Sequence, residues 1–164
     1  MKKIKYLLLL IIFCFPLLTL AEPENKEDEQ KQEEEVKEEY LNTLEGAEKI
    51  IPGDVITYEL KVKSSGAVSE YSTTLTYENT VIELISVENS DNFKGSNAIT
   101  KSPTELTFKH DTGITGEMTV AKIKFRAIKD GNKSDCTITL DGRVKIEDWT
   151  IKTTPKYTKN LSIK

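Results

Sequence analysis

The stretch PGDVITYELKVKSSGAVSEYSTTLTYENTVIELISV, residues 52–87, decides the fold class of this chain. Its apolar residues recur at every second position, which is typical of half-buried β-strands. The turn-forming groups Pro52-Gly53-Asp54 and Ser64-Ser65-Gly66 bound the first alternating run. The segment Val81–Val87 is apolar on both sides, which indicates a strand that is covered on both faces or locally bulged. The inward sets are Ile56, Tyr58, Leu60 and Val62, followed by Tyr71, Thr73, Leu75 and Tyr77.

The same pattern continues to the end of the chain. The alternation slips by one residue between Val120 and Ala121, which predicts a β-bulge. Turns are predicted at Asp111-Thr112-Gly113, at Asp130-Gly131-Asn132 and at Asp141-Gly142, the last of them a tight hairpin. No stretch after residue 50 has a helical period. About nine short strands at regular spacing predict an all-β sandwich.

The N-terminal residues predict a secretory signal peptide over residues 1–21. Three lysines precede an apolar run, and Thr19-Leu20-Ala21 has the small, spaced residues of a cleavage site. The run is shorter than the roughly 20 residues that span a bilayer. We therefore expect membrane contact only through the uncleaved signal segment, and a protein that is secreted or held at the cell surface by a partner.

An acidic segment follows the predicted signal peptide. Residues 22–49 contain 12 acidic and 4 basic side chains. Residues 50–164 contain 15 acidic and 16 basic side chains and are nearly neutral. Because the acidic segment has too little apolar surface to fold alone, we expect a linker over residues 22–45, disordered or partly helical. The sandwich domain is predicted over residues 46–164. Neither part has the concentrated basic face that nucleic-acid binding requires.

The sequence shows no arrangement typical of an enzyme or a metal site. Its single histidine, His110, is interpreted as an exposed turn residue, since catalytic partners meet in space rather than in sequence. The Asp-Gly pairs lack the acidic repeat of a calcium loop. Cys136 is the one cysteine after the signal peptide and alternates with Ile138 and Leu140, so we expect it in the core. We predict a non-catalytic monomer without a cofactor.

The segment from residue 46 to residue 140 resembles a cohesin domain. The resemblance is carried by the Pro52-Gly53-Asp54 turn, by Leu75-Thr76-Tyr77 with the apolar strand after it, and by the stretch Ala121–Phe125. It implies a nine-stranded jelly-roll sandwich that holds the dockerin of an enzyme, with the dockerin supplying calcium, in extracellular polysaccharide-degrading complexes. Two positions depart from the family's pattern. Glu78-Asn79 replaces Asp-Pro, and Ser72 stands where an Asp or Asn often faces the dockerin.

Two surfaces are candidates for binding. Outward residues of the flat strands could hydrogen-bond to a protein partner such as a dockerin: Ser72, Thr74, Thr76, Glu105, Thr107 and Lys109. The alternative is direct carbohydrate binding, in which Trp149 stacks on a sugar ring with Tyr157 as its companion; a lone tryptophan more often caps a core. A third possibility is a bacterial surface or adhesion module. The expected partner is an extracellular protein or a polysaccharide.

Overall fold

The computed structural model of the chain describes residues 39–95, 97–128 and 135–164. These residues form eight β-strands and no helix, which confirms the predicted all-β sandwich. The predicted signal peptide, most of the predicted linker and the turn predicted at residues 130–132 lie outside the described residues. Within the described part, no helix is long and apolar enough to cross a membrane.

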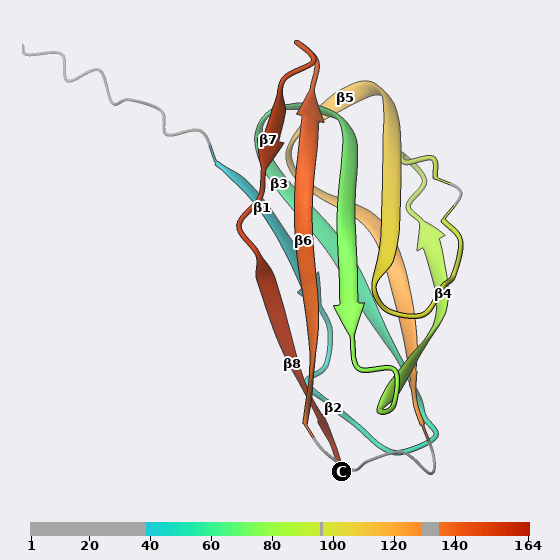
Figure 1. The fold of residues 1–164 in the computed structure, drawn as a ribbon. Coiled ribbons are helices and arrows are strands. Elements are labelled where there is room, and N and C mark those ends of the chain that lie inside the picture. The colour runs from blue at the N-terminus through green and yellow to red at the C-terminus, as the bar shows by residue number, and fades with distance from the viewer. Residues whose placement is uncertain (1–38, 96, 129–134) are drawn as a thin grey trace, which may run out of the picture. The chain divides into compact units, whose positions relative to one another are not determined.

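Two of the strands are unusually long, and each takes the place of two predicted strands. At residues 64–66 of β3 and 111–113 of β5, where separating turns were predicted, the chain bends without leaving the sheet (Figure 1). The strands are β1 (Tyr40–Glu45), β2 (Lys49–Ile50), β3 (Val55–Tyr77), β4 (Ile82–Asn89), β5 (Thr104–Ala127), β6 (Cys136–Ile146), β7 (Ile151–Thr153) and β8 (Tyr157–Ile163).

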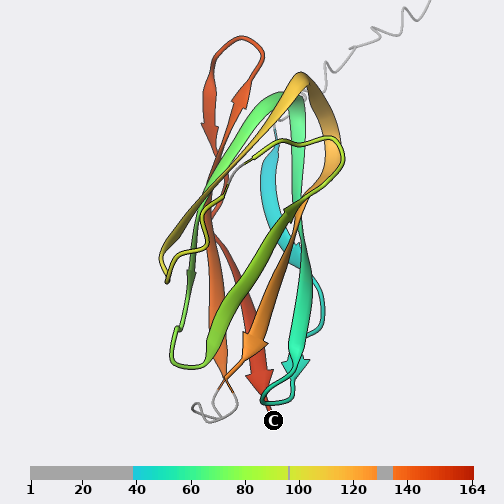
Figure 2. The ribbon, with the colours of Figure 1, turned by 90° about the vertical axis from the view of Figure 1, so that its right-hand side faces the viewer.

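The long strands β3 and β5 pass through both layers of the sandwich and arch over one end of it (Figures 1 and 2). The first layer contains β1, residues 55–64 of β3, residues 116–127 of β5, and β4. The second layer contains residues 104–109 of β5, residues 68–77 of β3, and β6. Strands β7 and β8 pair with β6, and β2 runs parallel to β8. Register shifts on both sides of Val68 lie in the arch, where bulges allow the ladder to bend.

The core lies between the layers, and the predicted inward residues are buried there. Tyr77 packs edge-on against Phe125 with ring centroids 5.1 Å apart, and Tyr71 stacks on Phe108 at 6.3 Å. The β-bulge predicted at Val120 and Ala121 is confirmed. The ladder with β3 shifts register there, and both side chains are buried.

Strand β1 corrects the predicted boundary between linker and domain. Glu39 is the first residue of the predicted linker that the structure describes, and Tyr40–Glu45 then pairs antiparallel with β3. Tyr40, Asn42 and Leu44 are buried in strict alternation. The four-residue spacing of Tyr40 and Leu44 fits a helical stripe as well as a strand, so the sequence alone left both readings open. The sandwich therefore includes residues 40–45.

The prediction of a hairpin at Asp141-Gly142 is wrong. Both residues lie inside β6, where Gly142 is paired with Thr73 of β3. A Cβ atom on Gly142 would lie 2.8 Å from Thr154 Oγ1 and 2.9 Å from the Tyr71 hydroxyl. This glycine therefore serves close packing rather than a turn.

By contrast, the predicted turn at Pro52-Gly53-Asp54 is confirmed. The Asp54 N–H donates to the Ile51 carbonyl at 3.0 Å, and Gly53 has a φ of 90°. Proline followed by a glycine of positive φ is the signature of a type II turn, which delivers the chain into β3.

Candidate functional site

The structure brings all six predicted partner-binding residues onto one surface, the outward side of the second layer. Ser72 lies opposite Thr107 of β5, and Thr74 lies opposite Glu105. On the other side of β3, Asp141 and Arg143 of β6 lie opposite Thr74 and Ser72. We call this surface the hydroxyl face, and define it by Ser72, Thr74, Thr76, Glu105, Thr107, Lys109, Asp141 and Arg143.

Hydroxyl groups connect the strands across this face. Thr74 Oγ1 donates to the Glu105 carboxylate at 2.7 Å, and the hydroxyls of Ser72 and Thr107 lie 3.3 Å apart. Only 8% of Ser72 is exposed. Ser72 therefore lies deeper in the surface than the alternation pattern alone implied, while Thr76, Glu105 and Lys109 are exposed.

Asp141 and Arg143 are functional candidates that the sequence reasoning missed. Both are exposed, and neither forms an ion pair with any residue that the structure describes. They were overlooked because Asp141 was assigned to a hairpin. The inward series Leu140, Gly142 and Val144 would have placed both on the outward side.

Shallow hollows follow β3 along the hydroxyl face and continue to the arch. The first has a volume of about 470 Å³ and is lined by Thr74, Glu105 and Arg143, among others. A second lies between Ser72 and Ile151, and a third, of about 250 Å³, lies at the arch. Short side chains of β3 line all three hollows. Residues of β6 flank all three, and residues of β5 flank the first and the third. The residues of β3 involved are Ser69, Glu70, Ser72, Thr73 and Thr74.

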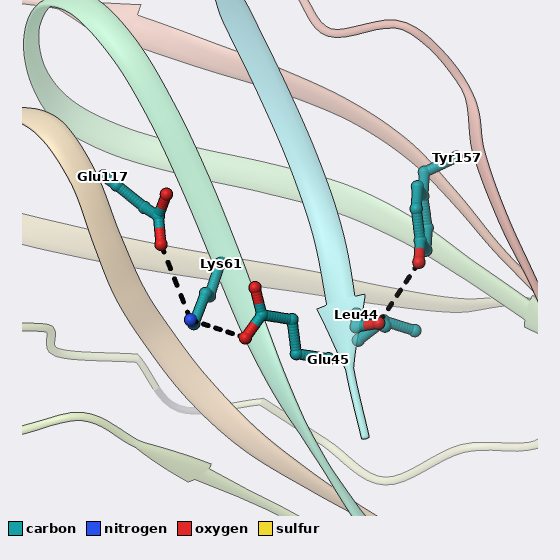
Figure 3. A network of polar contacts seen from close by, with 5 residues as sticks. All are labelled: Leu44, Glu45, Lys61, Glu117 and Tyr157. Carbon is teal, nitrogen blue, oxygen red and sulfur yellow. Dashed lines mark hydrogen bonds and ion pairs between the residues drawn. The ribbon is translucent and has the colours of Figure 1, made fainter. Parts of the chain in front are cut away.

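The outward side of the first layer has a different character. Lys61 of β3 forms ion pairs with Glu45 of β1 at 2.6 Å and with Glu117 of β5 at 3.5 Å (Figure 3). Further ion pairs cross the same layer. We call this surface the paired-charge face, and define it by the pairs Glu45–Lys61–Glu117, Glu39–Lys63, Glu88–Lys124 and Glu83–Arg126.

The two residues predicted to bind carbohydrate do not form one aromatic platform. Tyr157 packs against the core, and its hydroxyl donates to the Leu44 carbonyl at 3.2 Å, which ties β8 to β1 (Figure 3). Trp149 is instead 76% exposed and lies in the turn between β6 and β7, so it does not cap the core.

Among the residues that the structure describes, no catalytic constellation gathers around His110, the single histidine of the chain. His110 lies in β5 rather than in a turn and is half-buried, which corrects the prediction. Its ring packs edge-on against Phe93, and its Nδ1 accepts a hydrogen bond from the Thr112 N–H at 3.2 Å. Asp111 pairs instead with Lys94, and this hydrogen bond lowers the pKa of the Asp111 carboxyl.

Metal binding and thiol chemistry find little support in the same part of the chain. Among the described residues, no three His, Cys, Asp or Glu side chains gather as metal ligands would. Cys136 is buried in the core, and burial raises the pKa of its thiol to about 11. A thiol with so high a pKa is a poor nucleophile at neutral pH.

The comparisons with known proteins agree with this architecture. A family model of the cohesin domain matches residues 42–164. The chain belongs to the cohesin family. Cohesin domains are non-catalytic binding modules. No curated protein matches the chain significantly.

Several solved cohesins share the fold of this cohesin. One is the cohesin module of a family 33 glycoside hydrolase from Clostridium perfringens, with 11% identity, a TM-score of 0.68, and 77% of this chain and 97% of that one covered. The sixth cohesin of scaffoldin B from Acetivibrio cellulolyticus, solved with a Cel5 dockerin, has 15% identity, a TM-score of 0.62 and coverages of 77% and 99%. A non-cellulosomal cohesin from the archaeon Archaeoglobus fulgidus has 18% identity, a TM-score of 0.63 and coverages of 76% and 91%.

Proposed function

We propose that this cohesin is a secreted, non-catalytic module that binds the dockerin of another extracellular protein through its hydroxyl face. The observation that carries the proposal is the pairing of charges. The charged residues that define the paired-charge face bind one another, whereas Asp141 and Arg143 of the hydroxyl face have no ion-pair partner among the described residues. Lys109, at the edge of the hydroxyl face, pairs with Glu70 at 3.7 Å. Membership of the cohesin family supports it. The similar cohesin of Acetivibrio cellulolyticus was solved with a dockerin on it.

The chemistry of the hydroxyl face suits a protein partner. Serine and threonine hydroxyls both donate and accept hydrogen bonds. Short side chains also lose less conformational entropy when they are ordered than lysine or glutamate side chains do. Asp141 and Arg143 add the capacity for charge-assisted hydrogen bonds, which are stronger than neutral ones.

The charges of the face are also arranged unequally along β3. Glu105 and Asp141 flank Thr74, whereas Lys109 and Lys145 flank Glu70 at the other end. Such a gradient fixes the orientation of a charged partner, because reversing the partner would bring like charges together. We propose that the partner belongs to polysaccharide-degrading machinery, as the family resemblance implies. Direct sugar binding lacks the second exposed aromatic ring that it was predicted to use.

The test uses a substitution that fills the hollow beside Thr74. Each dockerin encoded in the genome of the source organism is produced as a calcium-loaded module and titrated into the purified protein by calorimetry, with calcium or with a chelator. At least one dockerin is expected to bind in calcium. Thr74→Arg should weaken that binding about 100-fold, because the arginine occupies the contact surface. The fold should tolerate the change, since Thr74 is paired with Glu105 on one side and with Asp141 on the other, and both carboxylates can accept hydrogen bonds from the arginine.

The matched control is Thr57→Arg, which changes the same residue type in the same strand but on the outward side of the first layer. It should leave the affinity unchanged. Two results would contradict the proposal: binding by no dockerin of the genome, or an equal loss of affinity in both variants.

A further inference from the structure

The turn between β6 and β7 places Trp149 in a backbone conformation that favours glycine. The Trp149 N–H donates to the Ile146 carbonyl at 2.9 Å, and the Ile146 N–H donates to the Thr150 carbonyl at 3.0 Å. These bonds are those of a type I turn followed by a left-handed residue. Trp149 occupies the left-handed position with a φ of 68°. This conformation costs an L-residue about 1–2 kcal/mol.

Contacts within the fold do not offset this strain. The indole of Trp149 is 76% exposed. Its ring contact in the described part of the chain is the Lys145 ammonium, 3.7 Å from the ring centroid. An exposed cation–π contact contributes only about 0.5–1 kcal/mol. Glycine would form the same turn without strain, so the folded structure itself gives no reason for a tryptophan here. Strained residues of this kind are typical of functional sites.

The register places this tryptophan beside the hydroxyl face. Lys145 is paired with Glu70 of β3 and with Ile151 of β7, so all three side chains project from the outward side of the second layer. Because the Lys145 ammonium lies over the indole, the ring of Trp149 is on that side as well. Ile151 is 62% exposed. The hollows along β3 run past both residues, since Ile151 lines the second and Trp149 the third.

The position of Trp149 is held firmly by the backbone. The Glu147 N–H donates to the Ala67 carbonyl in the arch of β3 at 3.1 Å, and the Thr150 N–H donates to Asp148 Oδ1 at 2.8 Å. This second bond also lowers the pKa of the Asp148 carboxyl. These bonds fix the backbone of the turn, so less backbone entropy is lost when Trp149 binds a partner.

We propose that Trp149 and Ile151 form an apolar anchor at the arch end of the hydroxyl face. The anchor binds an apolar side chain of the dockerin partner. Charges of both signs surround it, since the same two hollows are lined by Lys145 and Arg143 and by Glu70, Asp111 and Glu147. This inference rests on the proposed function and adds a specificity determinant to it. Tryptophan is enriched among the few residues that dominate protein interfaces, and burial of an exposed indole supplies a large apolar area.

A protein surface fits the anchor better than a sugar does. Sugars stack on open, flat rings, but the Lys145 ammonium covers one side of the indole. The neighbouring Ile151 is a branched aliphatic residue and offers no flat platform. Tyr157, the other predicted aromatic, packs against the core. An exposed apolar pair of this shape is instead suited to an apolar side chain of a protein partner.

Intrinsic fluorescence tests the anchor directly, because Trp149 is the only tryptophan in the chain. The dockerin that binds in the calorimetric screen, with any tryptophan of its own changed to phenylalanine, is titrated into the protein in calcium. The emission should shift to shorter wavelength, and acrylamide should quench it less. Trp149→Gly should weaken binding at least about tenfold. It should not lower the denaturant concentration at which the protein unfolds, since glycine relieves the strain.

Ile151 provides a second variant with a matched control. Ile151→Ala should weaken binding about threefold to tenfold, as the loss of a partly buried aliphatic contact does. Ile51 is equally exposed, at 63%, but lies in the turn before β3. Ile51→Ala should leave the affinity unchanged.

The possible results separate the anchor from the proposed function. A dockerin that binds with an unchanged spectrum, and equally well to Trp149→Gly, overturns the anchor and leaves the proposed function intact. If no dockerin binds, the proposed function fails and the anchor fails with it. A spectral shift on adding soluble xylan or cello-oligosaccharides, absent with every dockerin, overturns the anchor in favour of a sugar site.

Discussion

The paired-charge face and the hydroxyl face are the outward sides of the two layers, and both are polar, but their charged groups are used differently. On the paired-charge face, Lys61 is held by Glu45 and Glu117 from the two neighbouring strands (Figure 3). On the hydroxyl face, Asp141 and Arg143 have no ion-pair partner in the described part of the chain. The difference teaches that composition alone does not identify a binding face. Whether the charges are already paired is the more informative property.

The ion pairs of the paired-charge face are expected to affect the binding of a partner more than the stability of the fold. Exposed ion pairs contribute about 0–1 kcal/mol each, so the paired-charge face gains little stability from them. A partner that approached this face would first have to separate the pairs. On the hydroxyl face, Asp141 and Arg143 are available at no such cost, whereas Lys109 would first have to leave Glu70, at 3.7 Å. The two faces should therefore respond differently to substitution.

The largest effect on stability is expected beneath the hydroxyl face, at Gly142. Gly142→Ala should lower the free energy of unfolding by about 1–3 kcal/mol, because the added Cβ would press against Tyr71 and Thr154. Urea unfolding measures the change. Gly66→Ala is the matched control: its Cβ would lie no closer than 3.3 Å to a neighbour, so a smaller effect is expected. Equal losses of stability in the two variants would show that the packing around Gly142, beneath the hydroxyl face, is no tighter than the packing around Gly66.

The second effect is alkaline destabilisation, and it arises in the core rather than on either face. Burial raises the pKa of the Tyr71 hydroxyl from 10.0 to about 12 and that of the Cys136 thiol from 9.0 to about 11. Because both groups lose their protons at lower pH in the unfolded chain, stability should be full below pH 9. It should then fall as the pH rises through 11 and 12. Unfolding in urea between pH 7 and pH 12 measures this fall.

Tyr71→Phe distinguishes the hydroxyl from the rest of the core. It should remove part of the alkaline fall. At neutral pH it should cost about 1–2 kcal/mol, because the buried Asn42 amide loses the hydroxyl to which it donates at 3.0 Å. An unchanged alkaline profile would contradict the assignment to Tyr71, and Cys136→Ala would then be the next variant to measure.

The smallest effect is expected on the paired-charge face. Glu83→Gln and Glu45→Gln should each lower the free energy of unfolding by no more than about 0.5 kcal/mol and leave dockerin affinity unchanged. The loss should shrink further in 1 M salt, where the charges are screened. Asp141→Asn, on the hydroxyl face, should show the reverse: unchanged stability and weaker binding. If Glu83→Gln and Asp141→Asn changed stability and dockerin affinity in the same way, the distinction between the two faces would fail.

Much of the fold could be predicted from the sequence because the determining signals are local. The alternation from Ile56 to Val62 places side chains on two sides of a strand, and the slip at Ala121 marks a bulge that the structure contains. The errors have a common cause. Asp141-Gly142 is a hairpin signal by composition, but the glycine is needed where Tyr71 approaches from a distant part of the chain. No local pattern contains that information.

The candidate site was predictable to a similar extent. Alternation placed Thr74 and Glu105 on outward sides, and the ladder makes them neighbours. Exposure of single aromatic residues was not predictable. Tyr157 is held by a hydrogen bond to Leu44 across the sandwich, whereas Trp149 occupies a turn position that is usually glycine. The environment of Tyr157 arises from a contact between segments far apart in sequence, and that of Trp149 from a turn whose left-handed position the sequence pattern does not mark with glycine.

The arch of β3 and β5 also has a consequence for the rate at which the domain folds. The paired residues are close in sequence only near Leu75 and Thr104, and the separation grows along the ladder until Val55 meets Arg126. Pairing is therefore expected to begin at the Leu75 end, pass the register shifts around Val68 in the arch, and finish in the first layer. Sandwiches dominated by such non-local pairs fold in about milliseconds to seconds, far more slowly than helical bundles. The part of the hydroxyl face that β3 and β5 form would then come early. Its β6 residues come later, because Ser72 and Arg143 are as far apart in sequence as Val55 and Arg126.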